Sequence, residues 1–374
     1  MRFEVSRVLD AIEQRLCTDP ALARAVVDLS EVVRYVDLDG GRPANLLRLG
    51  LVVDALASHV GEDNVPVYAV VDRALMSDAD LTSNERMVIR RWADDGLVEV
   101  LASPGDRLLE AAELTGLPVL SRQTFDAWRD RYPWLATEPG RLLTPMPGHG
   151  GVVLGARVPG TPTRSSRPAG PPVLARLWRC PEPDCAAFGP ARLGRAGGQP
   201  PPRLRGGAPV CPRHDARLTD AGPRPVAVVL AVRVDRVIRQ RFCVAADQPI
   251  VVGRAPEGQR DAPGSVTIGQ WLNDEARRWI SRSHVRLELH GDDVVAADQS
   301  TNGTVIRLGG SMAEADRLVL TRDERRPLAE DDVLELYPDV QVGRVAALAG
   351  RGRAESSSVM AEAPTVSIRL GRGS

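Results

Sequence analysis

The sequence predicts a multidomain fold in three parts: an α/β domain with a parallel sheet, a small cysteine-containing connector, and an all-β sandwich at the C-terminus. Three observations predict it. Between residues 31 and 131, short apolar runs alternate with segments whose apolar residues recur at helical spacing, which is typical of a parallel sheet flanked by helices. Between 137 and 225 this regularity stops, and Pro, Gly and Arg dominate. Between 226 and 345 short strand-like runs return, at the spacing of a β-sandwich.

These changes of pattern set the predicted boundaries. The parts are a leading helical segment at 1–30, an α/β domain at 31–136, a linker at 137–174, a connector at 175–221, a sandwich at 226–345 and a disordered tail at 346–374.

Composition excludes several classes of protein. The net charge of the 374 residues is -1, so no global bias favours nucleic acid or a membrane surface, and all 48 basic residues are arginine. The charged N-terminus is unlike a signal peptide, and no apolar run approaches the roughly 20 residues of a membrane span. Two of the five cysteines, Cys17 and Cys243, are isolated in the sequence, which argues against a disulfide framework. These features predict a cytoplasmic protein.

The α/β region is predicted from alternating runs. A leading amphipathic helix places apolar residues at Val5, Val8, Leu9, Ile12 and Leu16. The predicted strands are Val32–Leu38, Val65–Val71, Leu97–Leu101 and Pro118–Leu120, and the predicted helices are Ala44–Val60, Asn84–Asp95 and Asp106–Leu114.

Four pieces of this region resemble the PIN-like or NYN ribonuclease family: residues 35–40 (YVDLDG), 68–72 (YAVVD), 103–109 (SPGDRLL) and 119–125 (VLSRQTF). The resemblance implies acidic residues that converge on Mg²⁺ or Mn²⁺ at the carboxyl ends of parallel strands, where the metal activates water against a phosphodiester. It places the candidate catalytic residues at Asp37, Asp39, Asp72 and Asp106.

One departure from that family bears on activity. Where the family carries Ser-Asn-Asp, this chain has Ser121, Arg122 and Gln123, so a carboxylate is lost and a cation is added. Other aspartates also have structural explanations: Asp39 begins a turn, and Asp106 follows Ser103 and Pro104 in a helix N-cap pattern. The sequence favours a catalytically degenerate module and leaves an active ribonuclease as the alternative.

The connector contains two pairs of metal-ligand type: Cys180-x4-Cys185 and Cys211-x2-His214. Thiolates with an imidazole suit tetrahedral Zn²⁺, and the knuckle-like spacing predicts a structural zinc site in a segment with little apolar material. The alternatives are a disulfide and unconnected thiols in a linker. The arginines around the site are interpreted as a solvated linker, with contacts to RNA as the other possibility.

The sandwich region carries three short motifs in order: residues 253–254 (GR), 281–284 (SRSH) and 298–304 (DQSTNGT). Together they resemble the forkhead-associated (FHA) domain, a β-sandwich that binds phosphothreonine peptides. The chemistry is apt, because a phosphate asks for fork-shaped cations and short hydroxyl donors. The resemblance implies that the phosphopeptide is bound by Arg254, Ser281, Arg282, Thr301 and Asn302, with Gly253, His284 and Gly303 as architectural residues.

Taken singly, each FHA-like motif has a simpler explanation: Asn302-Gly303 as a hairpin turn and Arg254 as a solvated charge. The segment 255–279 is long for the family and includes a helix-like stretch around 271–278. Jointly the motifs predict phosphothreonine-dependent recognition of proteins, downstream of a Ser/Thr protein kinase. Thr365 in the tail is a candidate internal phosphosite. The alternative function is a metal-dependent ribonuclease that its FHA domain recruits or regulates.

Overall fold

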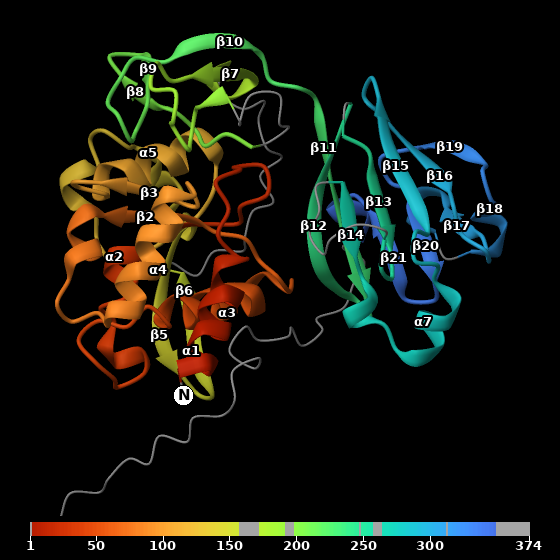
Figure 1. Cartoon of the computed structure of the whole chain (residues 1–374), viewed down its shortest axis with the longest axis horizontal. Coiled ribbons are helices and arrows are strands. Elements are labelled where there is room, and N and C mark those ends of the chain that lie inside the picture. Colours follow the sequence, from red (N-terminus) through yellow and green to blue (C-terminus); the bar gives the residue numbers. More distant parts are fainter. Residues whose placement is uncertain are drawn as a thin grey trace, which may run out of the picture.

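The computed structural model describes residues 2–156, 172–190, 198–246, 248–256, 264–311 and 313–348. Figure 1 shows an α/β domain, a C-terminal β-sandwich beside it, and a small connector lying over one end of the α/β domain. Thr365 and the tail from residue 349 onward lie outside the described residues.

The α/β domain contains one six-stranded sheet in the order β3-β2-β1-β4-β5-β6. Strands β1 to β5 are parallel, as predicted, and β6 is antiparallel to β5. The strands are β1 (Val26–Asp28), β2 (Tyr68–Asp72), β3 (Val98–Leu101), β4 (Val119–Leu120), β5 (Leu142–Gly148) and β6 (Gly151–Ala156). The main helices are α1 (Arg2–Glu13), α2 (Leu29–Val32), α3 (Arg48–Val60), α4 (Ser83–Asp94), α5 (Gly105–Thr115) and α6 (Trp134–Thr137).

The first strand of this sheet differs from the prediction. Val32–Leu38 is not a strand: the strand is β1, and Val36–Leu38 is a short 3-10 helix. The cause is Asp28, whose carboxylate accepts the Glu31 N–H (3.1 Å) and caps α2 directly after β1. An apolar run that changes from strand to helix within one residue has no single period for sequence analysis to detect.

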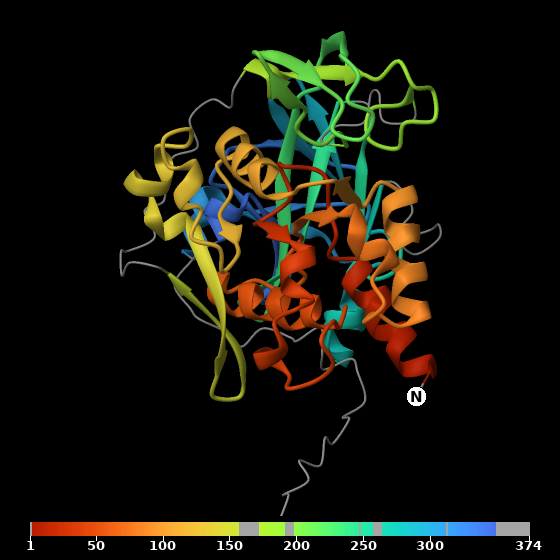
Figure 2. The same ribbon diagram turned by 90° about the vertical axis from the view of Figure 1, so that its left-hand side faces the viewer.

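The predicted range of the α/β domain, 31–136, is therefore too narrow at both ends. The central strand β1 lies inside the predicted leading segment, and the β5–β6 hairpin, which Figure 2 shows at one side of the domain, lies inside the predicted linker. Pro145 and Pro147 made this hairpin resemble a linker. Because β5 pairs with β4 only at Leu142 and Leu143, the proline part of β5 has β6 as its single neighbour, and prolines are tolerated at such an edge.

The connector consists of two short antiparallel pairs. β7 (Arg176–Arg179) pairs with β10 (Thr219–Pro223), and β8 (Arg203–Arg205) pairs with β9 (Ala208–Val210). Its apolar core is small: Phe188 and Leu218 are buried among three cysteines. A core of this size supplies little folding energy by itself.

The C-terminal domain is a sandwich of two sheets around one apolar core. The six-stranded sheet has the order β12-β11-β21-β20-β17-β18, from β11 (Ala227–Val234), β12 (Val237–Ala245), β17 (Thr304–Arg307), β18 (Arg317–Leu320), β20 (Val333–Tyr337) and β21 (Val340–Gly343). The five-stranded sheet has the order β14-β13-β15-β16-β19, from β13 (Ile250–Gly253), β14 (Ser265–Thr267), β15 (Val285–His290), β16 (Asp293–Asp298) and β19 (Arg325–Leu328).

Each run predicted as a strand contains one; these runs are 226–234, 241–244, 250–252, 284–289, 294–297, 305–308 and 333–337. The helix-like stretch contains α7 (Asp274–Trp279). The prediction missed β14, β18, β19 and β21. Two of these, β18 and β19, are short edge strands that carry exposed arginines, and charge on an edge hides the alternation of apolar residues. A last helix, α8 (Val345–Leu348), packs on β11 and β21.

The sandwich contacts the α/β domain directly through β12. The Asp63 N–H donates to the Ile238 carbonyl (2.7 Å), and the nearly buried carboxylates of Glu62 and Asp63 pair with Arg241 and Arg239. No helix in the described part of the chain is long and apolar enough to cross a membrane.

Candidate functional site

Three loops of the sandwich meet around Gly253, at the end of β13. A Cβ atom on Gly253 would lie 1.9 Å from the carbonyl oxygen of Arg282, so no other residue fits without moving the backbone. This close approach lets the Arg254 N–H donate to the Ser281 carbonyl (3.1 Å) and the Ala255 N–H donate to the Arg282 carbonyl (3.2 Å). These backbone hydrogen bonds bring the first motif (residues 253–254) into contact with the second (residues 281–284).

His284 holds the second loop from inside. Its side chain is fully buried, and its Nδ1 accepts the Ser281 N–H (3.1 Å). Burial lowers the pKa of His284 to about 4, so the ring is neutral at physiological pH and Nδ1 is free of a proton to accept this bond. His284 thus supports the second loop through a buried hydrogen bond to its backbone.

The third loop is fixed to the second by side chains. The Thr301 N–H donates to the Ser281 Oγ (3.1 Å), and the Asn302 Nδ2 donates to the Trp279 carbonyl (2.8 Å). Gly303 turns with φ +84°, which favours glycine, and its N–H donates to the Ser300 Oγ (2.7 Å). Because Ser281 accepts through its oxygen, its own O–H remains available as a donor to a ligand.

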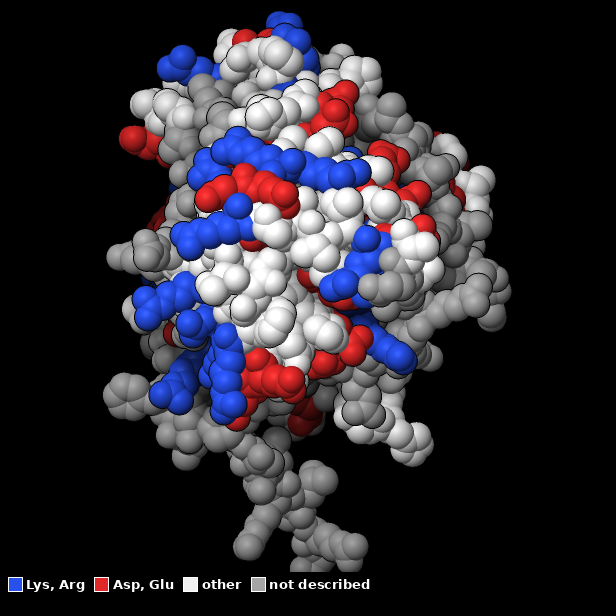
Figure 3. All heavy atoms as spheres, turned by 90° about the vertical axis from the view of Figure 1, so that its right-hand side faces the viewer, with Lys and Arg blue, Asp and Glu red and all other residues white. Residues whose placement is uncertain are grey.

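The converging loops carry cations without acidic partners. Within the described residues, neither Arg254 nor Arg282 makes an ion pair, and the buried Nε of Arg254 has no hydrogen-bond partner. Several other arginines of the sandwich do lie beside acids, as Arg286 does beside Glu288 (2.6 Å), and Figure 3 shows blue and red groups side by side on the outer face. Because the backbone of Arg254 is hydrogen-bonded to that of Ser281, and Arg282 follows Ser281, the two unpaired arginines come from adjacent segments that also carry the Ser281 hydroxyl. Such a set of residue types is suited to an anion.

The four predicted metal ligands of the connector also come together. The ligand atoms of Cys180, Cys185, Cys211 and His214 all lie within 4.8 Å of one another. The Cys185 and Cys211 sulfurs are 3.7 Å apart, and the His214 Nδ1 lies 3.5 Å from the Cys180 sulfur and 3.6 Å from the Cys211 sulfur. Tetrahedral Zn²⁺, with bonds of about 2.3 Å to S and about 2.05 Å to N, gives S···S edges of about 3.8 Å and S···N edges of about 3.5 Å. The residues fit a tetrahedral metal ion.

The same distances exclude the disulfide alternative. A separation of 3.7 Å between Cys185 and Cys211 is far above the roughly 2.05 Å of an S–S bond, and all five cysteines are free. Burial raises the pKa of the Cys180 thiol, and the hydrogen bond to Cys185 raises that of Cys211. The same hydrogen bond lowers the pKa of Cys185 to about 5, and a cation at the centre would favour the thiolate form of all three cysteines.

The four aspartates predicted from the ribonuclease resemblance lie in separate settings. Asp37 pairs with Arg122 through both oxygens (2.8 and 2.9 Å), and this hydrogen bonding lowers the pKa of Asp37. Asp106 pairs with Arg131 (2.7 Å), whereas Asp72 caps the next 3-10 turn through the Ala74 N–H (2.8 Å). The predicted N-cap arrangement of Ser103 and Asp106 is wrong, because Pro104 is the N-cap of α5 and no side chain makes a capping hydrogen bond there.

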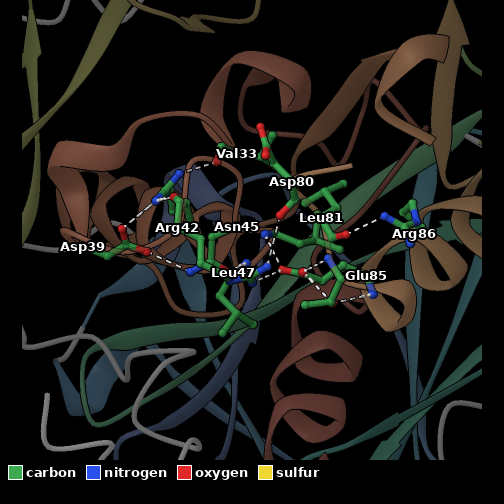
Figure 4. A network of polar contacts seen from close by, with 12 residues as sticks. Val33, Asp39, Arg42, Asn45, Leu47, Asp80, Leu81, Glu85 and Arg86 are labelled. Carbon is green, nitrogen blue, oxygen red and sulfur yellow. Dashed lines mark hydrogen bonds and ion pairs between the residues drawn. The ribbon is translucent and has the colours of Figure 1, made fainter. Parts of the chain in front are cut away.

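Asp39 is held in the polar network of Figure 4. Its carboxylate accepts from the buried guanidinium of Arg48 (2.8 Å), from the Asn45 amide (2.8 Å) and from the Gly41 N–H (2.9 Å). On the other side of the network, Glu85 accepts from Arg42 and from the Leu46 N–H. Asp39 therefore stabilises a turn, as the simpler interpretation of the sequence had it.

Sequence analysis missed the acidic residues at the point where the strand order reverses. Between β1 and β4, where open α/β sheets place their ligands, lie Asp28 and Glu31. Burial, aided by the charges of Glu31 and Asp72, raises the pKa of Asp28 to about 6. The sequence signal for this position is the apolar pair Val26-Val27 followed by the carboxylate of Asp28. The strand is difficult to recognise because α2 begins at the next residue.

The crevice at this point is occupied by the protein's own groups. Glu31 accepts from the Ser121 hydroxyl (2.6 Å) and the Arg122 N–H (3.2 Å), and the Arg122 guanidinium lies over the Tyr35 ring at 4.0 Å. Across the described ranges, the cysteine–histidine group is the only set of three or more His, Cys, Asp or Glu side chains close enough to hold a metal. The carboxylates near β1 do not form such a set.

No family model matches the chain, and no curated protein matches it. Several solved FHA domains match. They include the MEK1 FHA domain (22% identity, 31% of this chain and 85% of that chain, TM-score 0.23) and the FHA domain of human APLF in complex with an XRCC1 bisphospho peptide (17%, 31% and 99%, TM-score 0.21). Another is the FHA domain of an Arabidopsis thaliana hypothetical protein (22%, 32% and 82%, TM-score 0.23). TM-scores this low add no weight to the geometry of the loops.

Proposed function

We propose that the C-terminal sandwich is an FHA domain that binds phosphothreonine-containing proteins, and that this recognition is the main function of the chain. One observation carries the proposal: Gly253 and His284 bring two unpaired cations, Arg254 and Arg282, to the same end of the sandwich as the Ser281 hydroxyl. The chemistry there is that of a phosphate site, at which Thr301 would assist as a further hydroxyl donor, while Asn302 on the same loop would hold the peptide main chain.

The number of donors accounts for dependence on phosphorylation. Each hydrogen bond from a charged group to phosphate contributes roughly 1.5–3 kcal/mol. Two such bonds, lost with an unphosphorylated threonine, correspond to a decrease in affinity of roughly 100-fold or more. A partner with this modification implies a Ser/Thr protein kinase upstream, and the free thiols are in keeping with a cytoplasmic location.

The test of phospho-dependence uses the full chain and a library of paired peptides that differ only in phosphate on threonine. Binding measured by fluorescence anisotropy is expected for phosphothreonine peptides and absent for their unphosphorylated partners. Equal affinity within a pair, at every peptide that binds, contradicts the proposal.

We further propose that Cys180, Cys185, Cys211 and His214 hold a structural Zn²⁺. Support comes from tetrahedral distances and from three buried sulfurs, which are soft ligands. Elemental analysis of purified protein is expected to find about one zinc per chain, and Cys211→Ser is expected to lose it. A metal-free wild-type protein with an ordered connector contradicts the site.

The α/β domain is proposed to be a catalytically degenerate PIN-like module. Arg122 neutralises Asp37, Arg48 engages Asp39, and Arg131 engages Asp106, so these carboxylates are already partnered. The second candidate function is a Mg²⁺- or Mn²⁺-dependent ribonuclease, which the position of Asp28 at the end of β1 favours, since open α/β sheets place their ligands where the strand order reverses.

A cleavage assay with Mn²⁺ and single-stranded RNA separates these two candidates. The degenerate module predicts a rate at background that is unchanged in Asp28→Asn. Robust cleavage that requires Mn²⁺ and is lost in Asp28→Asn establishes the ribonuclease, with RNA as a second partner of the chain.

A further inference from the structure

We infer that metal binding in the connector stabilises the α/β domain, and that Arg107 couples the two parts. The inference rests on the proposed metal site and goes beyond it, because the stabilised domain contains none of the metal ligands.

Arg107 is a fully buried cation in α5. Its Nε donates to Glu99 of β3 (2.8 Å), and one terminal nitrogen donates to Glu110 (2.9 Å). The Tyr68 hydroxyl of β2 also donates to Glu99. A buried cation is tolerated only where its donors are satisfied, since the cost of removing it from water is several kcal/mol.

The connector satisfies the rest of this group. The Arg107 guanidinium also donates to the backbone carbonyls of Pro201 (a short contact) and Pro202 (3.2 Å). In return, the Leu204 N–H donates to the second oxygen of Glu110 (2.6 Å). Arg107 of α5 and its partner Glu110 therefore make their full set of hydrogen bonds only while the connector is docked on the α/β domain.

Residues next to the metal ligands hold the connector in place. Ala186, which follows Cys185, lies so close to Gly96 that a Cβ on this glycine would be 2.9 Å from the Ala186 Cβ. Arg213, which precedes His214, donates to the Ala93 carbonyl at the end of α4 (3.1 Å). Both contacts depend on segments whose conformation the metal would fix.

The small core of the connector makes this dependence strong. In the described part of the connector, Phe188 and Leu218 are buried beside the cysteines, and Leu177 and Val210 are further buried apolar residues. With so small a core, metal binding would supply much of the folding energy of the connector. Without metal, the carbonyls of Pro201 and Pro202 are no longer held at Arg107, and this cation loses two of its hydrogen-bond acceptors while those on Glu99 and Glu110 remain. Metal binding then stabilises the α/β domain by linkage.

The test is hydrogen exchange of the full chain by mass spectrometry, with zinc content measured on each sample. On removal of zinc by a chelator, peptides covering β3 and α5 are expected to exchange at least tenfold faster, while β15 and β16 of the sandwich exchange as before. Loss of zinc with unchanged exchange in β3 and α5 overturns the inference. If the wild-type protein binds no zinc, the proposed metal site is wrong; this outcome is distinguishable from a bound zinc whose removal leaves exchange unchanged.

Two variants locate the coupling. Ala186→Leu adds bulk against Gly96 and leaves all ligands and α5 intact; it is expected to retain zinc yet show the fast exchange of the chelated wild type. Arg107→Met is expected to show no further increase on chelation, and if it fails to fold, Ala186→Leu alone decides. The control is Arg205→Ala, which removes an exposed ion pair with Asp215 inside the connector. Slow exchange in Ala186→Leu, equal to that of Arg205→Ala, contradicts the coupling.

Discussion

The loop end of the sandwich and the carboxyl edge of the α/β sheet treat charge in opposite ways. At the loop end, the cations Arg254 and Arg282 have no acidic partner in the described part of the chain. At the sheet edge, Asp37, Asp39 and Asp106 are each paired with an arginine. Charges held without a partner by a rigid scaffold can take a ligand, whereas paired charges already contribute to the fold. The comparison explains why recognition is proposed for one domain and a degenerate module for the other.

The largest effect is expected from the scaffold of the sandwich. Gly253→Ala places a methyl group 1.9 Å from the Arg282 carbonyl and should lower the free energy of unfolding by about 3 kcal/mol, as denaturant titration would measure. Gly140→Ala is the matched control, since a Cβ at Gly140 meets nothing within 4 Å. Equal stability of the two variants would show that the loops are not held by this contact.

Acid should weaken the same scaffold through His284. Burial lowers its pKa from 6.5 to about 4, so the unfolded chain takes up the proton first, and stability falls as pH drops from about 6.5 towards 4. The loss should reach about 2 kcal/mol at pH 5. Denaturant titrations at pH 7 and pH 5 compare wild type with His284→Gln, in which an amide oxygen still accepts the Ser281 N–H. The variant should lack this part of the pH dependence. If the free energy of unfolding changes equally with pH in both proteins, His284 is not the cause of the loss.

The smallest effect is expected at the sheet edge. Arg122→Ala removes the cation beside Asp37, yet this pair is partly exposed, so the free energy of unfolding should fall by less than about 1 kcal/mol. Mn²⁺-dependent RNA cleavage should stay at background, because the carboxylates of this edge form no set of three close enough to hold a metal in the described part of the chain. Cleavage that appears in Arg122→Ala would show an inhibited enzyme where the comparison predicts a degenerate one.

The sequence motifs marked the contacts between the sandwich loops, whereas no motif marked the acidic residues at the sheet edge, and the reason for this difference is physical. Gly253, Ser281 and His284 lie in short motifs whose spacing reflects backbone contacts between loops. The ligands Cys180 and Cys211 are similarly readable, because few residue types bind a soft metal. Short motifs of this kind can be recognised in the sequence without knowledge of the fold.

The acidic residues at the sheet edge and their partners could not be predicted from local sequence patterns. Asp28 ends one strand and caps the next helix, so neither the strand pattern nor the helix pattern of apolar residues identifies it. The partners of Asp39 and Asp106 are Arg48 and Arg131, which only the tertiary fold brings near. The docking of the connector on Arg107 was likewise invisible, since it joins residues about 95 positions apart.

The most direct test of the central claim is calorimetric titration of the full chain with a phosphothreonine peptide. Arg254→Ala is expected to lower the affinity by roughly 100-fold or more, because the phosphate loses a fork-shaped donor. Arg286→Ala, which removes a cation already paired with Glu288 on the outer face, should bind like the wild type. Unchanged affinity in Arg254→Ala, or an equal loss in both variants, would contradict the assignment of the phosphate site to these loops.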